Sequence, residues 1–250
     1  MTSHVLIVAG SDSSGGAGIV RDIEAVSAFG LRCSLAVTAV TVQTHQRVAR
    51  IEQMPPDLVA DQMRAAFAAN PVAAVKIGML GTAATIDTVA SVLASCLPVP
   101  VVLDPVLAST SGRRLLDHDA IDTLKRRLFP LCALVTPNLP ELALLSDLPL
   151  ASGETEIVEQ AEKLFDAGVS AILVKGGHAT GATATDLLIQ PGREPVRFEA
   201  SRIPVAMRGT GCLLASAIAA HLARYETLEI SIGKAKRHVF ARLLASSVQV

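Results

Sequence analysis

Short apolar runs alternate with amphipathic stretches along the chain. The apolar runs are rich in valine, isoleucine and leucine at consecutive positions, which is typical of parallel strands buried on both faces. Such strands are predicted at residues 5–9, 34–42, 74–77, 101–103, 133–135 and 171–174. The stretches between them have apolar residues at helical spacing and predict helices at residues 17–29, 57–69, 83–94, 119–128 and 154–167. A repeat of this kind favours an α/β fold, with a mostly parallel sheet and helices on both faces.

The pattern changes in the last third of the chain. Residues 185–189 and 195–202 are strand-like and flank the turn segment Pro191-Gly192-Arg193, which is typical of a hairpin. We therefore expect an antiparallel edge on the sheet, followed by helices at 210–223 and from residue 228 onward. No linker or repeat indicates a second domain, so residues 1–250 are predicted to form a single domain.

Composition and charge narrow the possible partners. Half of the residues are apolar, 18% are charged and the formal net charge is −1. This balance gives no electrostatic reason to expect binding to nucleic acid or to an anionic membrane. The first apolar run is too short for a signal peptide or a membrane span. The four cysteines have no metal-ligand spacing, which favours a reduced, cytoplasmic compartment.

Polar and glycine-rich segments follow the predicted strands. In open α/β sheets, ligands bind beyond the carboxyl ends of the strands, so these segments are expected to assemble one site. They are Gly10 to Gly18, Gln43-Thr44-His45, Gly78-Met79-Leu80, Asp104-Pro105-Val106, Thr136-Pro137-Asn138 and Lys175-Gly176-Gly177-His178. The first of them contains neither G-x-G-x-x-G nor a P-loop, so a nucleotide would have to be bound by another route.

The segment Gly209-Thr210-Gly211-Cys212 leads into a helix of small residues. Glycines allow backbone amides to approach a ligand closely, and a helix N-terminus attracts anions. The helix dipole also lowers the pKa of a thiol. The segment therefore predicts an anion site with a reactive Cys212 beside it. The alternative is that Cys212 is a small buried apolar residue, as we expect for the other cysteines.

Five further side chains are candidates for the site. Three of them have two interpretations each, and two are charged groups beside buried strands that need an oppositely charged partner. Asp22 is either a solvated helix residue or a ligand contact, and Gln43 either bonds backbone or uses its amide to bind an aminopyrimidine or a pyridine. Asp104, at the end of a buried strand, needs a cation or a metal. Glu141, three residues after Asn138, either stabilises a first helical turn or helps to position Mg²⁺. Lys175, after another buried strand, needs an anion such as a phosphate.

Together these segments resemble the hydroxymethylpyrimidine/phosphomethylpyrimidine kinases of thiamine biosynthesis, in the ribokinase-like superfamily. The resemblance covers most of the chain and is specific because of the order and spacing of its motifs. The motifs are Val8-Ala9-Gly10-Ser11-Asp12, Ser14-Gly15-Gly16-Ala17-Gly18, Thr38-Ala39 through Gln43, Lys76-Ile77-Gly78-Met79-Leu80, Val102-Leu103-Asp104-Pro105-Val106, Thr136-Pro137-Asn138-Leu139-Pro140-Glu141, Val174-Lys175-Gly176-Gly177-His178 and Gly209-Thr210-Gly211-Cys212.

The resemblance implies a three-layer α/β/α ribokinase-like fold and phosphorylation that depends on ATP and Mg²⁺. Its implied substrate is 4-amino-5-hydroxymethyl-2-methylpyrimidine, whose monophosphate is then phosphorylated again, and family members are often homodimers. Cys212 stands where other members of the superfamily have an aspartate base, so a partly ionised thiol would take the hydroxyl proton in the first step. The implied assignments are Gly10, Asp22, Gln43, Met79 and Val106 for the substrate, Gly209, Thr210 and Gly211 for the anion hole, Asn138, Glu141 and Asp104 for the metal, and Cys212 and Lys175 for catalysis.

The chain departs from the family pattern at several places, among them the absence of a lysine that many members carry after Asp104-Pro105-Val106. The family usually has proline where this chain has Ser13, and commonly a Thr-His pair where it has Met207-Arg208. Beside the anion hole, Arg208 is a candidate for replacement positive charge toward ATP. The alternatives are a pyridoxal or pyridoxine kinase of the same superfamily, which Gln43 and Met79 disfavour, and a non-catalytic pyrimidine-binding protein.

Overall fold

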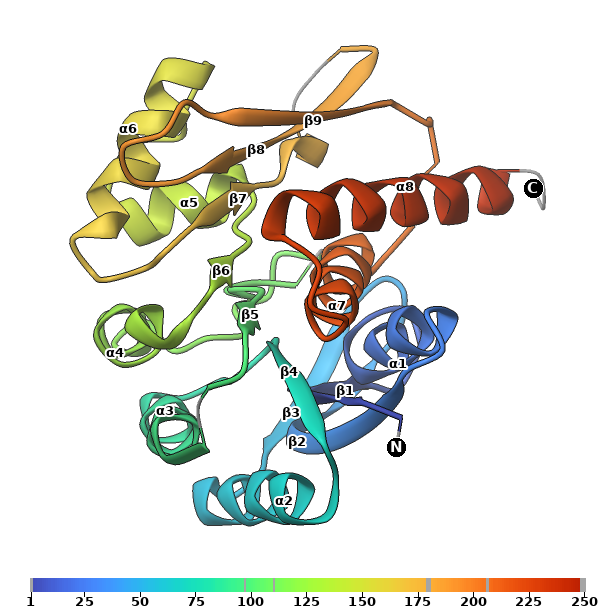
Figure 1. Ribbon diagram of the computed structural model, residues 1–250, viewed down its shortest axis with the longest axis vertical. Helices are drawn as coiled ribbons and strands as arrows, with labels where there is room; N and C mark the ends of the chain where they lie inside the picture. The colour runs from blue at the N-terminus through green and yellow to red at the C-terminus, as the bar shows by residue number, and fades with distance from the viewer. Residues whose placement is uncertain (1, 97, 110, 179–180, 206, 248–250) are drawn as a thin grey trace.

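A computed structural model describes residues 2–96, 98–109, 111–178, 181–205 and 207–247. Its strands form one nine-stranded sheet in the order β3-β2-β1-β4-β5-β6-β7-β8-β9 (Figure 1). All pairs from β2 through β7 are parallel, and the outer pairs β2–β3, β7–β8 and β8–β9 are antiparallel. The predicted α/β class with a mostly parallel sheet is therefore confirmed. The strands are β1 (His4–Asp12), β2 (Arg32–Gln43), β3 (Val48–Gln53), β4 (Val72–Ile77), β5 (Val101–Leu103), β6 (Leu134–Val135), β7 (Ile172–Val174), β8 (Thr183–Ile189) and β9 (Val196–Ser201).

Helices follow most of the strands and cover both faces of the sheet. They are α1 (Gly18–Ala28), α2 (Pro56–Ala69), α3 (Ala83–Cys96), α4 (Ala120–Arg127), α5 (Leu139–Ser146), α6 (Glu154–Phe165), α7 (Thr210–Leu222) and α8 (Leu228–Ser247), with 3-10 turns at Phe129–Leu131 and Gly176–His178. Among the described residues, none of these helices has the combined length and apolarity that crossing a bilayer requires.

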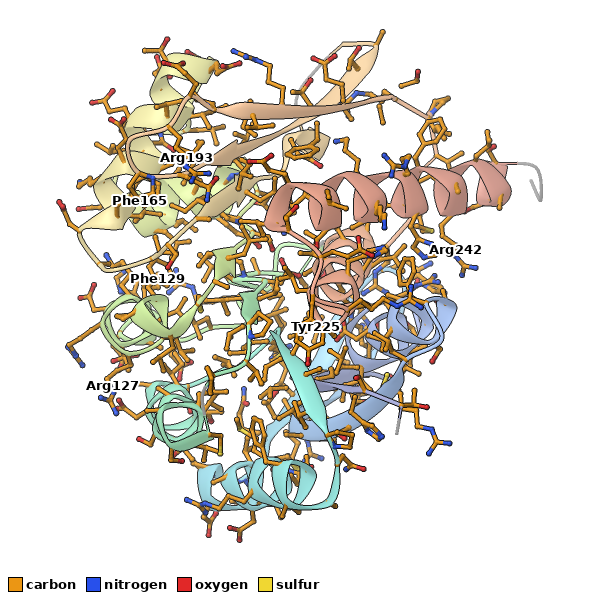
Figure 2. All side chains as sticks on the ribbon, viewed as in Figure 1. Arg127, Phe129, Phe165, Arg193, Tyr225 and Arg242 are labelled. Atoms are coloured by element: carbon orange, nitrogen blue, oxygen red, sulfur yellow. The ribbon has the colours of Figure 1, made fainter. Side chains whose placement is uncertain are left out.

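Alternating side chains of each central strand enter two separate cores. Leu6 and Val8 of β1 join the core beneath α2 to α6, whereas Val5 and Ile7 join the core beneath α1, α7 and α8. Side chains fill the space on both faces of the sheet (Figure 2). Because successive residues of a strand point to opposite faces, a continuous apolar run is what a sheet covered on both sides requires. This explains why periodicity located the central strands well.

The strand order reverses at β1. The chain passes from β1 to β2 on one side and then returns to β4 on the other, so β1 lies between two strands that follow it in sequence. Connections on opposite sides leave a crevice at the carboxyl ends of β1 and β4, where open α/β sheets bind ligands. Gly10 and Met79, at these strand ends, both line a cavity at this edge of the sheet.

Two elements were not predicted, and one loop is shorter than expected. The strand β3 was missed because it is an edge strand whose residues are mostly exposed or partly exposed, so it lacks a continuous apolar run. The helix α5 was missed because it is only eight residues long and its leucines show no clear amphipathic period. Gly10 to Asp12, expected in a loop, instead extend β1 past a register shift between Ala9 and Ser11. Because β3 pairs with β2 in antiparallel fashion, the sheet has antiparallel pairs at both edges rather than one.

Candidate active site

A cavity of about 750 Å³ opens at the carboxyl edge of the sheet. Its walls come from strand ends, from the start of α7 and from α8, which are far apart in sequence. Of the predicted site residues, Asp22 is the one absent from its lining. Those that line it are Gly10, Gln43, Met79, Asp104, Val106, Asn138, Glu141, Lys175, Gly209, Thr210, Gly211 and Cys212. The expectation that the strand-end segments meet at one place is thus met by the geometry.

Glycine at position 209 fixes the start of α7. Its φ is 73°, and a Cβ at this position would lie 2.6 Å from the carbonyl oxygen of Gly16. No L residue with a side chain fits there without moving the backbone. Among the described residues, no side chain caps the helix, so the amides of Thr210, Gly211 and Cys212 lie at the cavity without a capping acceptor. Such an uncapped N-terminus suits an anionic group.

The Cys212 thiol is not the acidic group that the helix start predicted. Burial raises its pKa to about 12, although the positive charge of Lys76 and the amide of Gly18 act in the opposite direction. The negative charges of Asp22 and Asp104 add to the effect of burial. The dipole argument was wrong in direction here, because it left out the cost of removing the thiolate from water. At neutral pH the thiol is therefore protonated.

Asp22 lies beneath the cavity rather than at its mouth. Its carboxylate is fully buried, 2.7 Å from Lys76 Nζ, and it accepts a second hydrogen bond from Ser216 Oγ at 2.8 Å. Burial by itself lowers the pKa of Lys76, but the nearby Asp22 outweighs it, so the pKa lies above its ordinary value. Both earlier interpretations of Asp22, as a surface residue and as a substrate contact, are therefore replaced by a buried ion pair.

Lys76 is a functional candidate that the sequence reasoning missed. It lines the floor of the cavity, and its charge acts on the Cys212 thiol. The signal was present in the sequence, because Lys76 interrupts an apolar strand just as Lys175 follows one. A lysine in that setting needs an anionic partner, and the same reasoning would have identified it.

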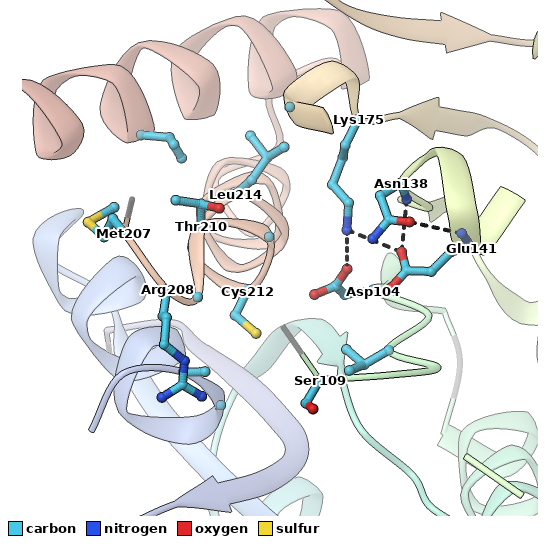
Figure 3. Close-up of a pocket in the computed structure, with 18 of the residues that line it drawn as sticks. Asp104, Ser109, Asn138, Glu141, Lys175, Met207, Arg208, Thr210, Cys212 and Leu214 are labelled. Carbon is cyan, nitrogen blue, oxygen red and sulfur yellow. Dashed lines mark hydrogen bonds and ion pairs between the residues drawn. The ribbon is translucent and has the colours of Figure 1, made fainter. Parts of the chain in front are cut away.

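A second lysine lies against the predicted metal group (Figure 3). Lys175 Nζ is 2.6 Å from Asp104 Oδ1 and 3.7 Å from Glu141 Oε2. Burial raises the pKa of Asp104 by itself, but Lys175 and Lys76 outweigh burial, and the pKa lies below its usual value. The arrangement gives this end of the cavity one cation between two carboxylates.

Asn138 and Glu141 form the capping box of α5. The Asn138 side chain accepts a hydrogen bond from the Glu141 amide at 2.8 Å, and Glu141 Oε2 accepts one from the Asn138 amide at 2.8 Å. The first-turn interpretation of Glu141 is therefore what the structure shows. In the described chain, Asp104 Oδ2 and Glu141 Oε1 accept no hydrogen bond from protein, so each carboxylate retains an oxygen for another ligand.

These free carboxylate oxygens suit a cation that is bound partly by the protein and partly by water and phosphate. No three His, Cys, Asp or Glu side chains of the described residues are close enough to enclose a metal. Mg²⁺ usually keeps several waters and is bound by one or two carboxylates together with substrate phosphates. The donor set here matches that mode and does not match an all-protein cage.

The opposite end of the cavity is built around Gln43 and Gly10. The Ser13 hydroxyl donates to the Gln43 carbonyl at 2.9 Å and accepts from the Gln43 amide at 2.8 Å, so it fixes the backbone of that residue. Glycine at position 10 leaves room for Met79, because a Cβ there would lie 3.1 Å from Met79 Sδ. The hydroxyl of Ser13, where the family usually has proline, thus has a structural function beside the predicted substrate contacts.

Comparison with known proteins places these features in a family. Residues 12–250 match the family model described as phosphomethylpyrimidine kinase. A hydroxymethylpyrimidine/phosphomethylpyrimidine kinase from Rhizobium meliloti is 42% identical over 98% of this chain and 92% of its own length. The kinase of that name from Aquifex aeolicus is 38% identical over 92% of this chain and 90% of its own.

Solved structures agree with this assignment. A crystal structure of phosphomethylpyrimidine kinase from Clostridium difficile 630 superposes with a TM-score of 0.83 at 30% identity and covers 97% of this chain and 100% of that one. Pyridoxal kinase from Staphylococcus aureus in complex with ADP superposes with a TM-score of 0.87 at 27% identity, over 96% and 87% of the two chains. The pyridoxal kinases are thus structural neighbours at lower identity. The chain belongs to the hydroxymethylpyrimidine/phosphomethylpyrimidine kinase family, the ribokinase-like enzymes that phosphorylate hydroxymethylpyrimidine and then its monophosphate in thiamine biosynthesis.

Proposed function

We propose that residues 1–250 act as one kinase domain whose cavity holds ATP at one end and the pyrimidine at the other. The observation that supports this most directly is the position of the uncapped start of α7. It lies in the same cavity as the Lys175 group and as Gly10, Gln43, Met79 and Val106. A phosphoryl group between the two ends would meet backbone amides in transit, which is what phosphoryl transfer requires of a protein.

The base of ATP is assigned to the apolar wall formed by α8 and the segment before α7. Val239, Phe240 and Leu243 of α8 line the cavity together with Ile203 and Val205. An adenine ring has two apolar faces, and an apolar wall can pack against them without hydrogen bonds to the ring. The ADP complex of the S. aureus pyridoxal kinase shows that a related kinase of this fold binds the nucleotide.

In the first step, the γ-phosphoryl group moves from ATP to the hydroxymethyl oxygen. The bond from the γ-phosphorus to the bridging oxygen of ADP breaks, and a bond to the acceptor oxygen forms. Lys175 and the amides of Gly209 to Cys212 stabilise the charge on the transferred group. Asp104 and Glu141, with Asn138 beside them, would hold Mg²⁺, which would supply positive charge toward the phosphates.

Cys212 is proposed to contact the acceptor hydroxyl. Because the thiol is protonated at neutral pH, we assign it a hydrogen bond that positions the hydroxyl rather than the removal of its proton in advance. The proton then leaves the acceptor oxygen late, once bonding to phosphorus has made it acidic, and passes to an oxygen of the transferred phosphoryl group. In the second step the acceptor is an anionic phosphate, and this contact matters less.

Release of ADP tests the function. The purified chain should release two ADP per hydroxymethylpyrimidine, and no ADP when Mg²⁺ is removed by chelation. Faster turnover of pyridoxal than of the pyrimidine would favour the alternative that the S. aureus structures raise. Tight pyrimidine binding without any ADP release would favour a non-catalytic binding protein.

Assembly and compartment are part of the proposal. We propose a homodimer, as the family resemblance implies, with the exposed Val40 and Val42 of β2 as a candidate contact. The mass in solution should be that of two chains, and Val42→Lys should reduce it to one if this face is used. A cytoplasmic compartment is consistent with the free thiols of Cys33, Cys96, Cys132 and Cys212.

A further inference from the structure

Arg208 joins three segments at the acceptor end of the cavity. Its Nη1 donates to Ser14 Oγ at 3.0 Å and to the Thr44 carbonyl at 3.1 Å, and its Nη2 lies 3.3 Å from Asp12 Oδ2. In Figure 3 the side chain extends to the opposite side of Cys212 from Lys175. Arg208 is thus directed toward the end that contains Gln43, away from the predicted phosphates of ATP.

One edge of the guanidinium group retains its hydrogen-bonding capacity. Both hydrogens of Nη1 are used, whereas Nε and Nη2 donate no hydrogen bond to the described residues. The approach of Nη2 to Asp12 is a charge contact only, because Asp12 Oδ2 accepts no hydrogen bond in the described chain. Nε–H and Nη2–H form the planar pair with which arginine binds two oxygens of one phosphate.

The glycine-rich segment packs against the other edge of the guanidinium group, at Nη1. A Cβ at Gly16 would lie 3.1 Å from Arg208 Nη1 and 3.3 Å from His45 Nδ1. Glycine at this position lets the guanidinium group and the imidazole approach the backbone together. The Arg208 side chain remains 16% exposed, and it lines the cavity. A ligand in the cavity can therefore reach it.

We propose that Arg208 binds the phosphate of the monophosphate acceptor and so determines how well the second phosphorylation proceeds. The inference rests on the proposed function, in which one cavity accepts first a neutral alcohol and then a phosphate monoester. Lys175 and the metal group serve the nucleotide, so the acceptor phosphate requires a cation of its own. This replaces the expectation that Arg208 contributes charge toward ATP.

Asp12 allows the proposal to be tested by the direction in which acceptor selectivity changes. It balances the charge of Arg208 when the acceptor carries no phosphate, and it repels the phosphate when the acceptor does. Removal of the arginine and removal of the aspartate should therefore change selectivity in opposite directions. If Arg208 only ties the three segments together, the two removals should act in the same direction on both acceptors.

The experiment compares kcat/KM for the monophosphate with kcat/KM for the alcohol, at saturating ATP. Arg208→Gln should lower this ratio by about ten- to a hundredfold, the range for hydrogen bonds to a charged group. Arg208→Lys should fall between wild type and Arg208→Gln, because it keeps the charge and loses the planar pair. Asp12→Asn should raise the ratio. Arg113→Gln is the matched control, since Arg113 donates to the Val48 and Ala49 carbonyls without lining the cavity, and it should leave the ratio unchanged.

Calorimetric binding of each acceptor to the enzyme without ATP separates failure of this inference from failure of the proposed function. Weaker binding of the monophosphate to Arg208→Gln and Arg208→Lys, with tighter binding to Asp12→Asn, supports the inference even if wild type turns over neither acceptor. An unchanged ratio in Arg208→Gln overturns it, as does a lower ratio in both Arg208→Gln and Asp12→Asn. A rise in the KM for ATP with the ratio unchanged also overturns it and restores the nucleotide as the partner of Arg208.

Discussion

Two lysine–aspartate pairs near Cys212 have similar lengths and different surroundings. Lys76 and Asp22 are 2.7 Å apart and completely shielded from solvent. Lys175 and Asp104 are 2.6 Å apart, but Lys175 is 13% exposed at the wall of the cavity. The sealed pair is held by α1 and α7 and has no route to a ligand for its aspartate. Lys175 of the open pair can exchange its contact with Asp104 for one with phosphate oxygens. The sealed pair therefore supports the fold beneath the cavity, with its charge felt at Cys212, whereas the open pair can contact a ligand directly.

Removal of one charge from the sealed pair should have the largest effect on the protein. Lys76→Met leaves Asp22 buried without its counter-ion, a change that typically costs about 3–5 kcal/mol. Unfolding in urea should show this loss of free energy. The double variant Lys76→Met, Asp22→Leu removes both charges and should recover most of it. A single variant as stable as wild type would show that the pair is not ionised together.

Removal of the lysine from the open pair should affect turnover more than folding. Lys175→Met should lower kcat by about 10²–10³-fold, the usual effect of losing one charge-stabilising donor in a transition state. The free energy of unfolding should fall less than for Lys76→Met, because Asp104 can gain water from the cavity. Steady-state kinetics and urea unfolding of the two variants together check the contrast. Equal stability losses would remove the distinction between the pairs.

Cys212 lies between the two pairs, and its substitution should have a smaller effect. Cys212→Ala should lower the single-turnover rate of the first phosphorylation by about three- to tenfold, the worth of one neutral hydrogen bond. The second phosphorylation should lose less, since its acceptor is an anionic phosphate. Cys212→Ser keeps a hydrogen-bonding group and should retain most of the first rate. A loss of 10² or more in the first rate, in both Cys212→Ala and Cys212→Ser, would identify a proton-accepting thiolate instead. Equal losses in the first and second phosphorylations would contradict the role assigned to Cys212.

Sequence reasoning located the central strands and most of the cavity because both depend on local signals. Continuous apolar runs identified the strands, and polar residues after them identified the site edge, including Lys175 and Gln43. Asp22 was misplaced because its environment depends on α7, nearly two hundred residues later, which supplies Ser216. The pKa of Cys212 was misjudged for a related reason. A helix N-terminus is visible in sequence, whereas burial among Lys76, Asp22 and Asp104 depends on the assembled fold.

The smallest expected effect is in the pH dependence of the first phosphorylation. Because the pKa of Cys212 is about 12, the thiol stays protonated from pH 7 to 9, and kcat should show no rise with the slope of a thiolate across that range. Alkylation of Cys212 by iodoacetamide provides an independent readout, since only the thiolate reacts. Its rate, followed by mass spectrometry of the peptide that contains Cys212, should increase about tenfold for each pH unit between 7 and 10 without a plateau. Cys212→Ser should have the same flat kcat profile as wild type. A plateau in alkylation below pH 9 would mean that Lys76 and the start of α7 together outweigh burial, and the thiol would then belong functionally with the open pair.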